Sequence, residues 1–135
     1  MERDRTIEGT TGMGGMEIHE RAVGTITVLG PVGKLVLSEG QRDNVLKDTI
    51  SGIMLQGRRQ FMVDLAQVSY ADTSGLAMLV AAHVTVIKRG GQIKLLHPTK
   101  RLRELFGVTR LNTVFEVFDS ERDAIDSFTK ESPPI

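Results

Sequence analysis

The sequence predicts an α/β fold, a single domain in which about four helices accompany a mixed β-sheet. Short runs rich in β-branched and aromatic residues alternate with segments of helical apolar spacing from residue 39 to residue 128. Residues 16–37, in contrast, contain strand-like runs. Alternation of this kind places helices over a mainly parallel sheet, and the N-terminal strands add a mixed or antiparallel edge.

The N-terminal part is expected to supply the edge strands. Residues 1–15 are polar and glycine-rich, so we expect a flexible arm there. A strand or two follows, with residues 25–29 the clearest segment. The sequence GPVG at 30–33 is expected to form a turn or an irregular edge, after which 34–37 resumes a strand.

The rest of the chain is expected to alternate between helices and strands. The first helix is predicted over 39–56, with Ser38 as its N-cap and Gly57 as its C-terminal stop. The predicted elements after it are a buried strand at 60–68, a helix at 74–89 stopped by Gly90-Gly91, a strand at 92–97, a helix at 98–106 ended by Gly107, a strand at 113–118 and a last helix from 119 to 128. We therefore expect one domain over 16–129 and a C-terminal tail over 130–135.

Composition excludes several classes of function. Lys plus Arg equals Asp plus Glu at 17 each, which argues against a nucleic-acid binder that acts through a strong positive field. The absence of cysteine excludes disulfides, thiolate metal sites and a cysteine nucleophile. The three histidines, His19, His83 and His97, lack the spacing of metal ligands, so no metal is expected. No stretch approaches the roughly 18 apolar residues of a membrane span, and a cytoplasmic location is expected.

The segment YADTSGL, residues 70–76, is the strongest candidate site. It lies where a predicted strand gives way to a helix, whose first N–H groups are unpaired and carry about half a positive charge. One interpretation is purely structural, because Asp72 or Thr73 is a favoured helix cap. A serine nucleophile is disfavoured, because Asp72 and Leu76 stand where a hydrolase serine turn needs glycine, and one histidine such as His97 makes no triad.

A third interpretation is that Ser74 accepts a phosphoryl group. Such a group would lie at the helix N-terminus, where the dipole and the free N–H groups tolerate it. It would add about −1.5 to −2 charges beside Asp72, and would change the surface rather than unfold the domain. The cap and the phosphate acceptor both remain open at this point.

Residues 61–128 resemble the anti-sigma factor antagonist family, whose domain is the STAS domain, and residues 16–60 resemble it more loosely. The motifs that carry the resemblance are a strand containing Asp64, the box Asp72-Thr73-Ser74-Gly75-Leu76, Gly90-Gly91 before the next strand, and the ending LFGVTRLNTVFEVFDS. The resemblance implies a STAS-like fold. It also implies a binding protein that needs no cofactor and is not an enzyme.

The resemblance implies a phosphorylation switch. Ser74, with Thr73 as the alternative acceptor, would be phosphorylated by an anti-sigma factor that is a serine kinase. The unphosphorylated protein, a monomer or weak dimer, would bind that kinase and free a sigma factor, and a phosphatase would restore it. The alternatives are a STAS-like subunit of a transport assembly, a stressosome-type scaffold component, and a small-ligand module that uses the anion site at the helix start.

One departure from the family bears on this switch. The family often reads Gly-Glu-Leu-Asp at its first-strand turn, with the Asp near the phosphate site, and Gly33 is expected to occupy that position here. The predicted partner surface includes the 30–33 turn, the box and the helix after it. Its residues are Gly30, Pro31, Val32, Gly33, Asp72, Thr73, Ser74, Gly75, Leu76 and Met78, and for Met78 core packing is an equal alternative.

Overall fold

The computed structural model describes residues 5–11, 16–37 and 44–130. Its strands are β1 (Arg5–Thr11), β2 (Met16–Val23), β3 (Ile26–Leu35), β4 (Gln60–Asp64), β5 (Val68–Ala71), β6 (Gln92–Leu96) and β7 (Val117–Phe118). Its helices are α1 (Val45–Leu55), α2 (Thr73–Lys88), α3 (Lys100–Thr109) and α4 (Glu121–Lys130), with a 3₁₀ turn, η1, at Leu111–Thr113. Within the described ranges, no helix has the length and hydropathy needed to cross a membrane.

The strands form one mixed sheet in the order β1-β2-β3-β4-β6-β7. The first three strands are antiparallel neighbours, and every pair from β3 to β7 is parallel. Strand β5 pairs with the far end of β3, so β3 has β4 along its beginning and β5 along its end. The predicted α/β architecture with an antiparallel N-terminal edge is confirmed.

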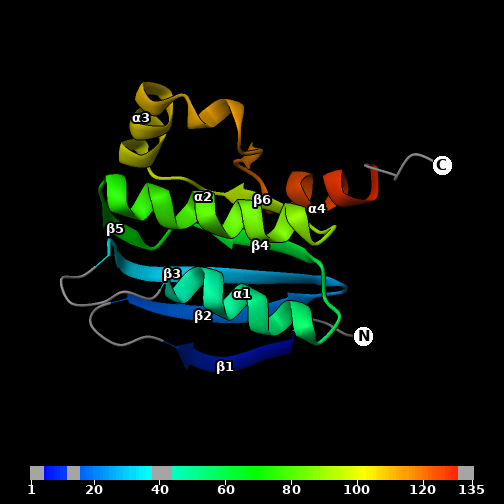
Figure 1. The fold of residues 1–135 in the computed structure, drawn as a ribbon. Coiled ribbons are helices and arrows are strands. Elements are labelled where there is room, and N and C mark those ends of the chain that lie inside the picture. The colour runs from blue at the N-terminus through cyan, green and yellow to red at the C-terminus, as the bar shows by residue number, and fades with distance from the viewer. Residues whose placement is uncertain (1–4, 12–15, 38–43, 131–135) are drawn as a thin grey trace.

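Two hydrophobic layers hold the helices on the sheet. Helices α1 and α2 cover one face, as Figure 1 shows, and bury the larger core between them and the strands. Helix α4 covers part of the opposite face with a smaller cluster. Successive side chains of β3 point to opposite faces of the sheet. Leu29 therefore lies in the larger core and Val28 in the smaller one.

The N-terminal region is more regular than the sequence indicates. The predicted arm contains strand β1, and residues 30–33, predicted as a turn or an irregular edge, lie inside β3 and pair with β2. Pro31 is tolerated there, because β3 has no paired neighbour on its other side between Leu29 and Gly33. Gly33 takes a positive φ of 101°, and the pairing with β5 is irregular at this point.

Other element boundaries also differ. The N-cap of α1 is Asn44, whose side chain accepts from the N–H of Lys47, whereas the predicted cap, Ser38, lies outside the described residues. The predicted strand at 60–68 is two strands, because an Asp64 side-chain bond to the N–H of Ala66 turns the chain between β4 and β5. Helix α3 continues past Gly107 to a left-handed cap at Arg110.

Several boundaries are confirmed. Gly57 ends α1 with a φ of 96°, and its N–H donates to the carbonyl of Met54. Helix α2 ends before Gly90, whose φ is 79°. The predicted last helix is present as α4, and it buries Ala124 and Phe128. The strand predicted at 113–118 is reduced to Val117–Phe118, because η1 occupies the chain before it.

Candidate functional site

Asp72 organises the start of α2. Its Oδ1 accepts hydrogen bonds from the N–H groups of Ser74 (2.9 Å) and Gly75 (3.2 Å), and from Ser74 Oγ (2.6 Å). The bond from the Ser74 hydroxyl, followed by the backbone bonds, holds the pKa of Asp72 below its ordinary value. The structural interpretation is therefore correct in part, because Asp72 is the N-cap and is ionised at neutral pH.

The Ser74 hydroxyl connects two elements. While it donates to Asp72, it accepts from the backbone N–H of Leu37 at 2.9 Å, just beyond the end of β3. The side chain is half-buried, and Thr73 beside it is exposed. Ser74 thus lies half-buried at a helix N-terminus, where the helix dipole favours an added negative charge.

The structure brings no histidine into hydrogen-bond contact with Ser74 among the described residues. His97 instead contacts Asp64, with Nδ1 and Oδ1 3.4 Å apart. His83 packs its ring edge-on to Phe115, with ring centroids 5.4 Å apart. Among the described residues, Ser74 therefore has no histidine partner of the kind that a serine–histidine–aspartate triad requires.

Gly75 allows the close approach of α2 to β3. A Cβ at this position would lie 1.9 Å from the carbonyl oxygen of Leu35 and 2.8 Å from its carbonyl carbon. Any side chain would therefore push the helix start away from the strand. The glycine that follows Ser74 is what brings the Ser74 hydroxyl within reach of Leu37.

The segment that reaches Ser74 is not the one predicted. Residues 30–33 pair with β2, and Gly33 donates its N–H to the carbonyl of Gln67, whereas Leu37 bonds to Ser74.

The predicted partner surface is only partly exposed. Asp72, Thr73 and Ser74 lie at the surface or half-buried. Met78 is 5% exposed and belongs to the larger core, so its assignment to an exposed helix face was wrong and the core alternative holds. The other members are half-buried at Gly30, Val32 and Gly33, and buried at Pro31, Gly75 and Leu76.

Two exposed residues near the end of β3 were not among the predicted site residues. Leu37 is 43% exposed and Tyr70, in β5, is 49% exposed. Tyr70 pairs in register with Lys34, so both flank the end of β3 that supports Ser74. An aromatic residue two positions before a helix cap is a usable sequence signal, but its importance depends on β5, which the sequence did not indicate.

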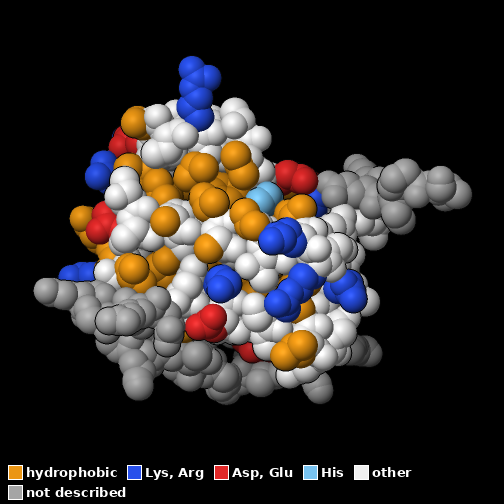
Figure 2. Space-filling view, viewed as in Figure 1, with side chains coloured by type: hydrophobic (Ala, Val, Ile, Leu, Met, Phe, Trp, Pro, Cys, Tyr) orange, Lys and Arg blue, Asp and Glu red, His pale blue; other side chains and the backbone are white. Residues whose placement is uncertain are grey.

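Apolar side chains also gather on the helical face. Figure 2 shows them in the upper part of this view, over α2 and α3. The exposed apolar residues of these helices and of the turn after them are Val84, Ile87, Val108 and Val114. Contiguous exposed apolar surface of this kind is typical of protein interaction sites. The same part of the described chain holds no cluster of three or more metal-ligating side chains.

Comparison with known proteins agrees with this fold. Residues 23–124 match the model of the STAS domain family. The chain is 33% identical over 73 residues to an anti-sigma-B factor antagonist of Bacillus subtilis, a match that covers 54% of this chain and just under two thirds, 66%, of that protein.

Two solved structures have the same fold. An anti-sigma factor antagonist from Mycobacterium paratuberculosis matches with a TM-score of 0.68 at 17% identity, over 83% of this chain and 92% of that one. The anti-sigma factor antagonist SpoIIAA in its unphosphorylated form matches with a TM-score of 0.63 at 18% identity, over 86% of this chain and 99% of that one.

Proposed function

Since the chain belongs to the STAS domain family, we propose that it is an anti-sigma factor antagonist that is switched by phosphorylation of Ser74. In this proposal the unphosphorylated form binds an anti-sigma factor that is a serine kinase, and this binding frees a sigma factor. The protein catalyses no reaction itself and acts through its surface. A phosphatase returns it to the binding form.

The observation that carries the proposal is the position of the Ser74 hydroxyl. It is half-buried at the first turn of α2, beside the exposed Thr73, and its oxygen already accepts one N–H, from Leu37. A phosphoryl oxygen at this place has backbone donors and the positive end of the helix dipole near it. The relatives' names, as anti-sigma factor antagonists, support the same assignment.

Phosphorylation would change this site in a defined way. The Ser74 oxygen would lose the proton that it donates to Asp72 Oδ1, and the phosphoryl group would add about −1.5 to −2 charges beside an ionised carboxylate. The phosphoryl group and the Asp72 carboxylate would repel each other, because Ser74 Oγ and Asp72 Oδ1 lie only 2.6 Å apart in the unmodified protein. A partner seated over Thr73, Leu37 and Tyr70 would then meet added bulk and negative charge.

A pull-down from lysate of the native host tests the proposal. Wild type and Ser74→Ala are expected to recover a small kinase, and Ser74→Asp is expected to lose it. Thr73→Ala is the matched control, because it removes a neighbouring hydroxyl that is exposed. Incubation of the recovered kinase with ATP should phosphorylate wild type and Thr73→Ala but leave Ser74→Ala unmodified, as read by peptide mass spectrometry.

A second candidate is a STAS-like subunit of a transport assembly. One observation favours it: the two hydrogen bonds of Ser74 Oγ give this hydroxyl a structural role that needs no phosphate. In that case Ser74→Ala, Ser74→Asp and wild type would all recover the same membrane-transport subunits, and a kinase would be absent from all three samples.

A further inference from the structure

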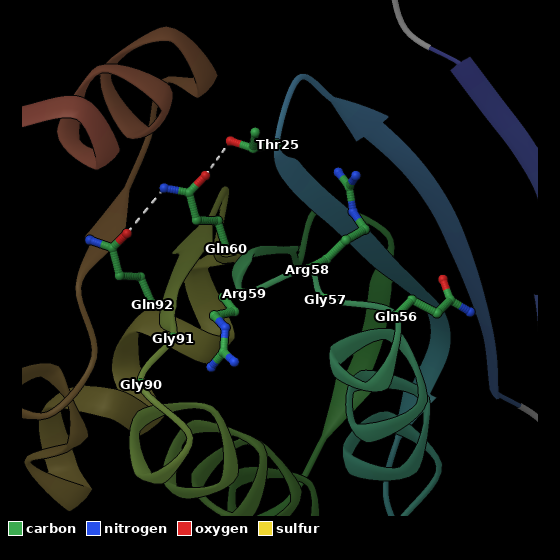
Figure 3. A pocket seen from close by; sticks show the side chains of 9 residues that line it. All are labelled: Thr25, Gln56, Gly57, Arg58, Arg59, Gln60, Gly90, Gly91 and Gln92. Atoms are coloured by element: carbon green, nitrogen blue, oxygen red, sulfur yellow. Dashed lines mark hydrogen bonds between the residues drawn. The ribbon is translucent and has the colours of Figure 1, made fainter.

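A polar hollow lies at the end of the sheet opposite Ser74. It has a volume of about 540 Å³ and lies where β4 and β6 begin and α1 and α2 end. Figure 3 shows its lining residues, which come from the β2–β3 hairpin, the end of α1, the start of β4, and the turn before β6 with the first residue of β6. The lining residues are Thr25, Gln56, Gly57, Arg58, Arg59, Gln60, Gly90, Gly91 and Gln92.

The side chains of this lining are all polar or positively charged, apart from the three glycines. The lining residues carry two guanidinium groups, three side-chain amides and one hydroxyl, and none of the nine, all of them described, carries a carboxylate or an apolar side chain. The chain as a whole is neutral, so this is a local concentration of positive charge. Figure 2 shows Lys and Arg side chains gathering over this end of α1 and α2, where the exposed Lys88 and Arg89 end α2.

The two arginines are held in place by the protein. Arg58 donates from Nε to Thr27 Oγ1 (2.6 Å) and from Nη2 to the carbonyl of Gly24 (3.1 Å). Arg59 donates from Nη1 to the carbonyl of Arg89, at the end of α2. Among the described residues, Nη1 of Arg58 and Nη2 of Arg59 make no hydrogen bond, so each guanidinium keeps a free donor on a fixed side chain.

The ends of the two helices do not cancel this charge. Helix C-termini carry partial negative charge on their last carbonyls. The N–H groups of Gln56 and Gly57 bond to carbonyls at the end of α1, and the Arg59 guanidinium bonds to a carbonyl at the end of α2. These hydrogen bonds neutralise part of the negative partial charge at both helix C-termini. The positive charge of Arg58 therefore contributes to the electrostatic potential of the hollow.

Three glycines lie in the lining. A Cβ at Gly91 would lie 2.5 Å from the carbonyl oxygen of Arg59 and 2.9 Å from Val86 Cγ1, so the turn before β6 packs closely against the start of β4 and the end of α2. Gly57 and Gly90 have φ values of 96° and 79°, a backbone conformation that favours glycine. Between them, Thr25, Gln60 and Gln92 form a hydrogen-bonded chain of side chains, drawn in Figure 3, that presents amide and hydroxyl groups along one wall.

We propose that this hollow binds a phosphorylated sugar. The two guanidinium groups of the lining suit phosphate oxygens, and its amides and hydroxyl suit sugar hydroxyl groups. A lipid headgroup with its acyl chains is disfavoured, because the lining has no apolar side chain. A nucleotide is disfavoured, because the lining has no aromatic ring on which a base could stack. The volume lies within the range of small-molecule sites, about 300–1,000 Å³, and exceeds what a bare phosphate needs.

Amide NMR spectra of the full chain, titrated with fructose 1,6-bisphosphate, test this proposal. We expect saturable shifts concentrated at residues 56–60 and 90–92, none with fructose, and weaker binding of inorganic phosphate at the same ionic strength. Equal affinity for inorganic phosphate would overturn the sugar and reduce the site to a simple anion site. Shifts that are absent, or that centre on the basic start of α3, would overturn the site itself.

Variants locate the binding. Arg59→Gln is expected to weaken the bisphosphate by about tenfold or more, because one charge-assisted contact is lost, and Arg58→Gln by a similar factor. Arg122→Gln, which removes an exposed arginine from α4, is the matched control and should leave the affinity unchanged. If Arg58→Gln shifts amide signals outside the hollow, the fold itself has changed, and the test then rests on Arg59→Gln. The Arg59 side chain is exposed, so its replacement should leave the fold unchanged. Unchanged affinity in Arg59→Gln contradicts the proposal.

Discussion

The backbone N–H of Leu37 donates a hydrogen bond to Ser74 Oγ, with the two atoms 2.9 Å apart. This contact joins the end of β3 to the start of α2, across 37 positions of the sequence. The same oxygen donates its proton to Asp72. A hydroxyl at the centre of the proposed switch is therefore also a connection between two elements of the fold.

The first prediction concerns the stability of Ser74→Ala. The variant loses the bonds to Leu37 and Asp72, and we expect the free energy of unfolding to fall by about 1 kcal/mol, the usual net value of such hydrogen bonds. Thr73→Ala should stay within about 0.5 kcal/mol of wild type, because Thr73 is exposed. Urea unfolding followed by circular dichroism measures both. Equal stability of the two variants would show that the Leu37 contact contributes nothing.

The second prediction compares two glycines. Gly75→Ala places a Cβ 1.9 Å from the Leu35 carbonyl oxygen, and we expect a loss of about 3 kcal/mol from overpacking. Gly52→Ala places a Cβ in open space inside α1, and should gain about 0.5–1 kcal/mol through helix propensity. Thermal unfolding of both variants distinguishes them. If both alanines stabilise the protein, α2 does not approach β3 as described.

The third prediction concerns acid stability through Asp72. Its pKa is lowered in the folded protein, first by the Ser74 side-chain bond, so its ionised form stabilises the fold above the ordinary value of 3.8. That contribution is lost as the pH falls through the lowered folded value. Asp72→Asn should therefore be less stable than wild type at pH 6, and the gap should narrow below about pH 3.8. A constant gap from pH 6 to pH 2.5 in urea unfolding would contradict the assignment.

The fourth prediction concerns His83. Burial lowers the pKa of His83, against a smaller raising effect of Glu116, and Nδ1 is buried without a hydrogen bond among the described residues. The unfolded chain therefore binds this proton more readily, and stability should fall as the pH drops below 6.5 towards the lowered folded value. His83→Leu should remove this slope, whereas His19→Gln, at an exposed position, should keep it. Urea unfolding at several pH values between 7.5 and 5 measures the slope. An NMR titration in which His83 protonates above pH 6.5 would refute the prediction.

Much of the fold was readable from local patterns. Helix α2 and strand β6 were predicted within one or two residues, because apolar spacing and the glycines at 90 and 91 mark their ends. Asp72 was recognised as a possible cap for the same reason: capping depends on residues three apart. These features depend on neighbours in sequence, which a single chain reveals.

The differences depend on contacts between distant segments. The 30–33 segment reads as a turn from its glycines and proline, yet pairing with β2 keeps it in β3, and an unpaired stretch on its other side accommodates Pro31. Met78 lies on a helix that is apolar on several sides, so its buried position follows only from the packing of α1 against α2. Tertiary packing overrode the local preference in both cases.

The sequence alone determined the α/β class, the helix start at Asp72-Thr73-Ser74 and the resemblance to anti-sigma factor antagonists, because each resides in local composition and spacing. Only the tertiary structure decided that Leu37 reaches Ser74, and that Arg58 and Arg59 line one hollow with Gln92. The physical reason is that parallel strands bring their ends together through crossovers of many residues, and no local pattern specifies which side chains then meet.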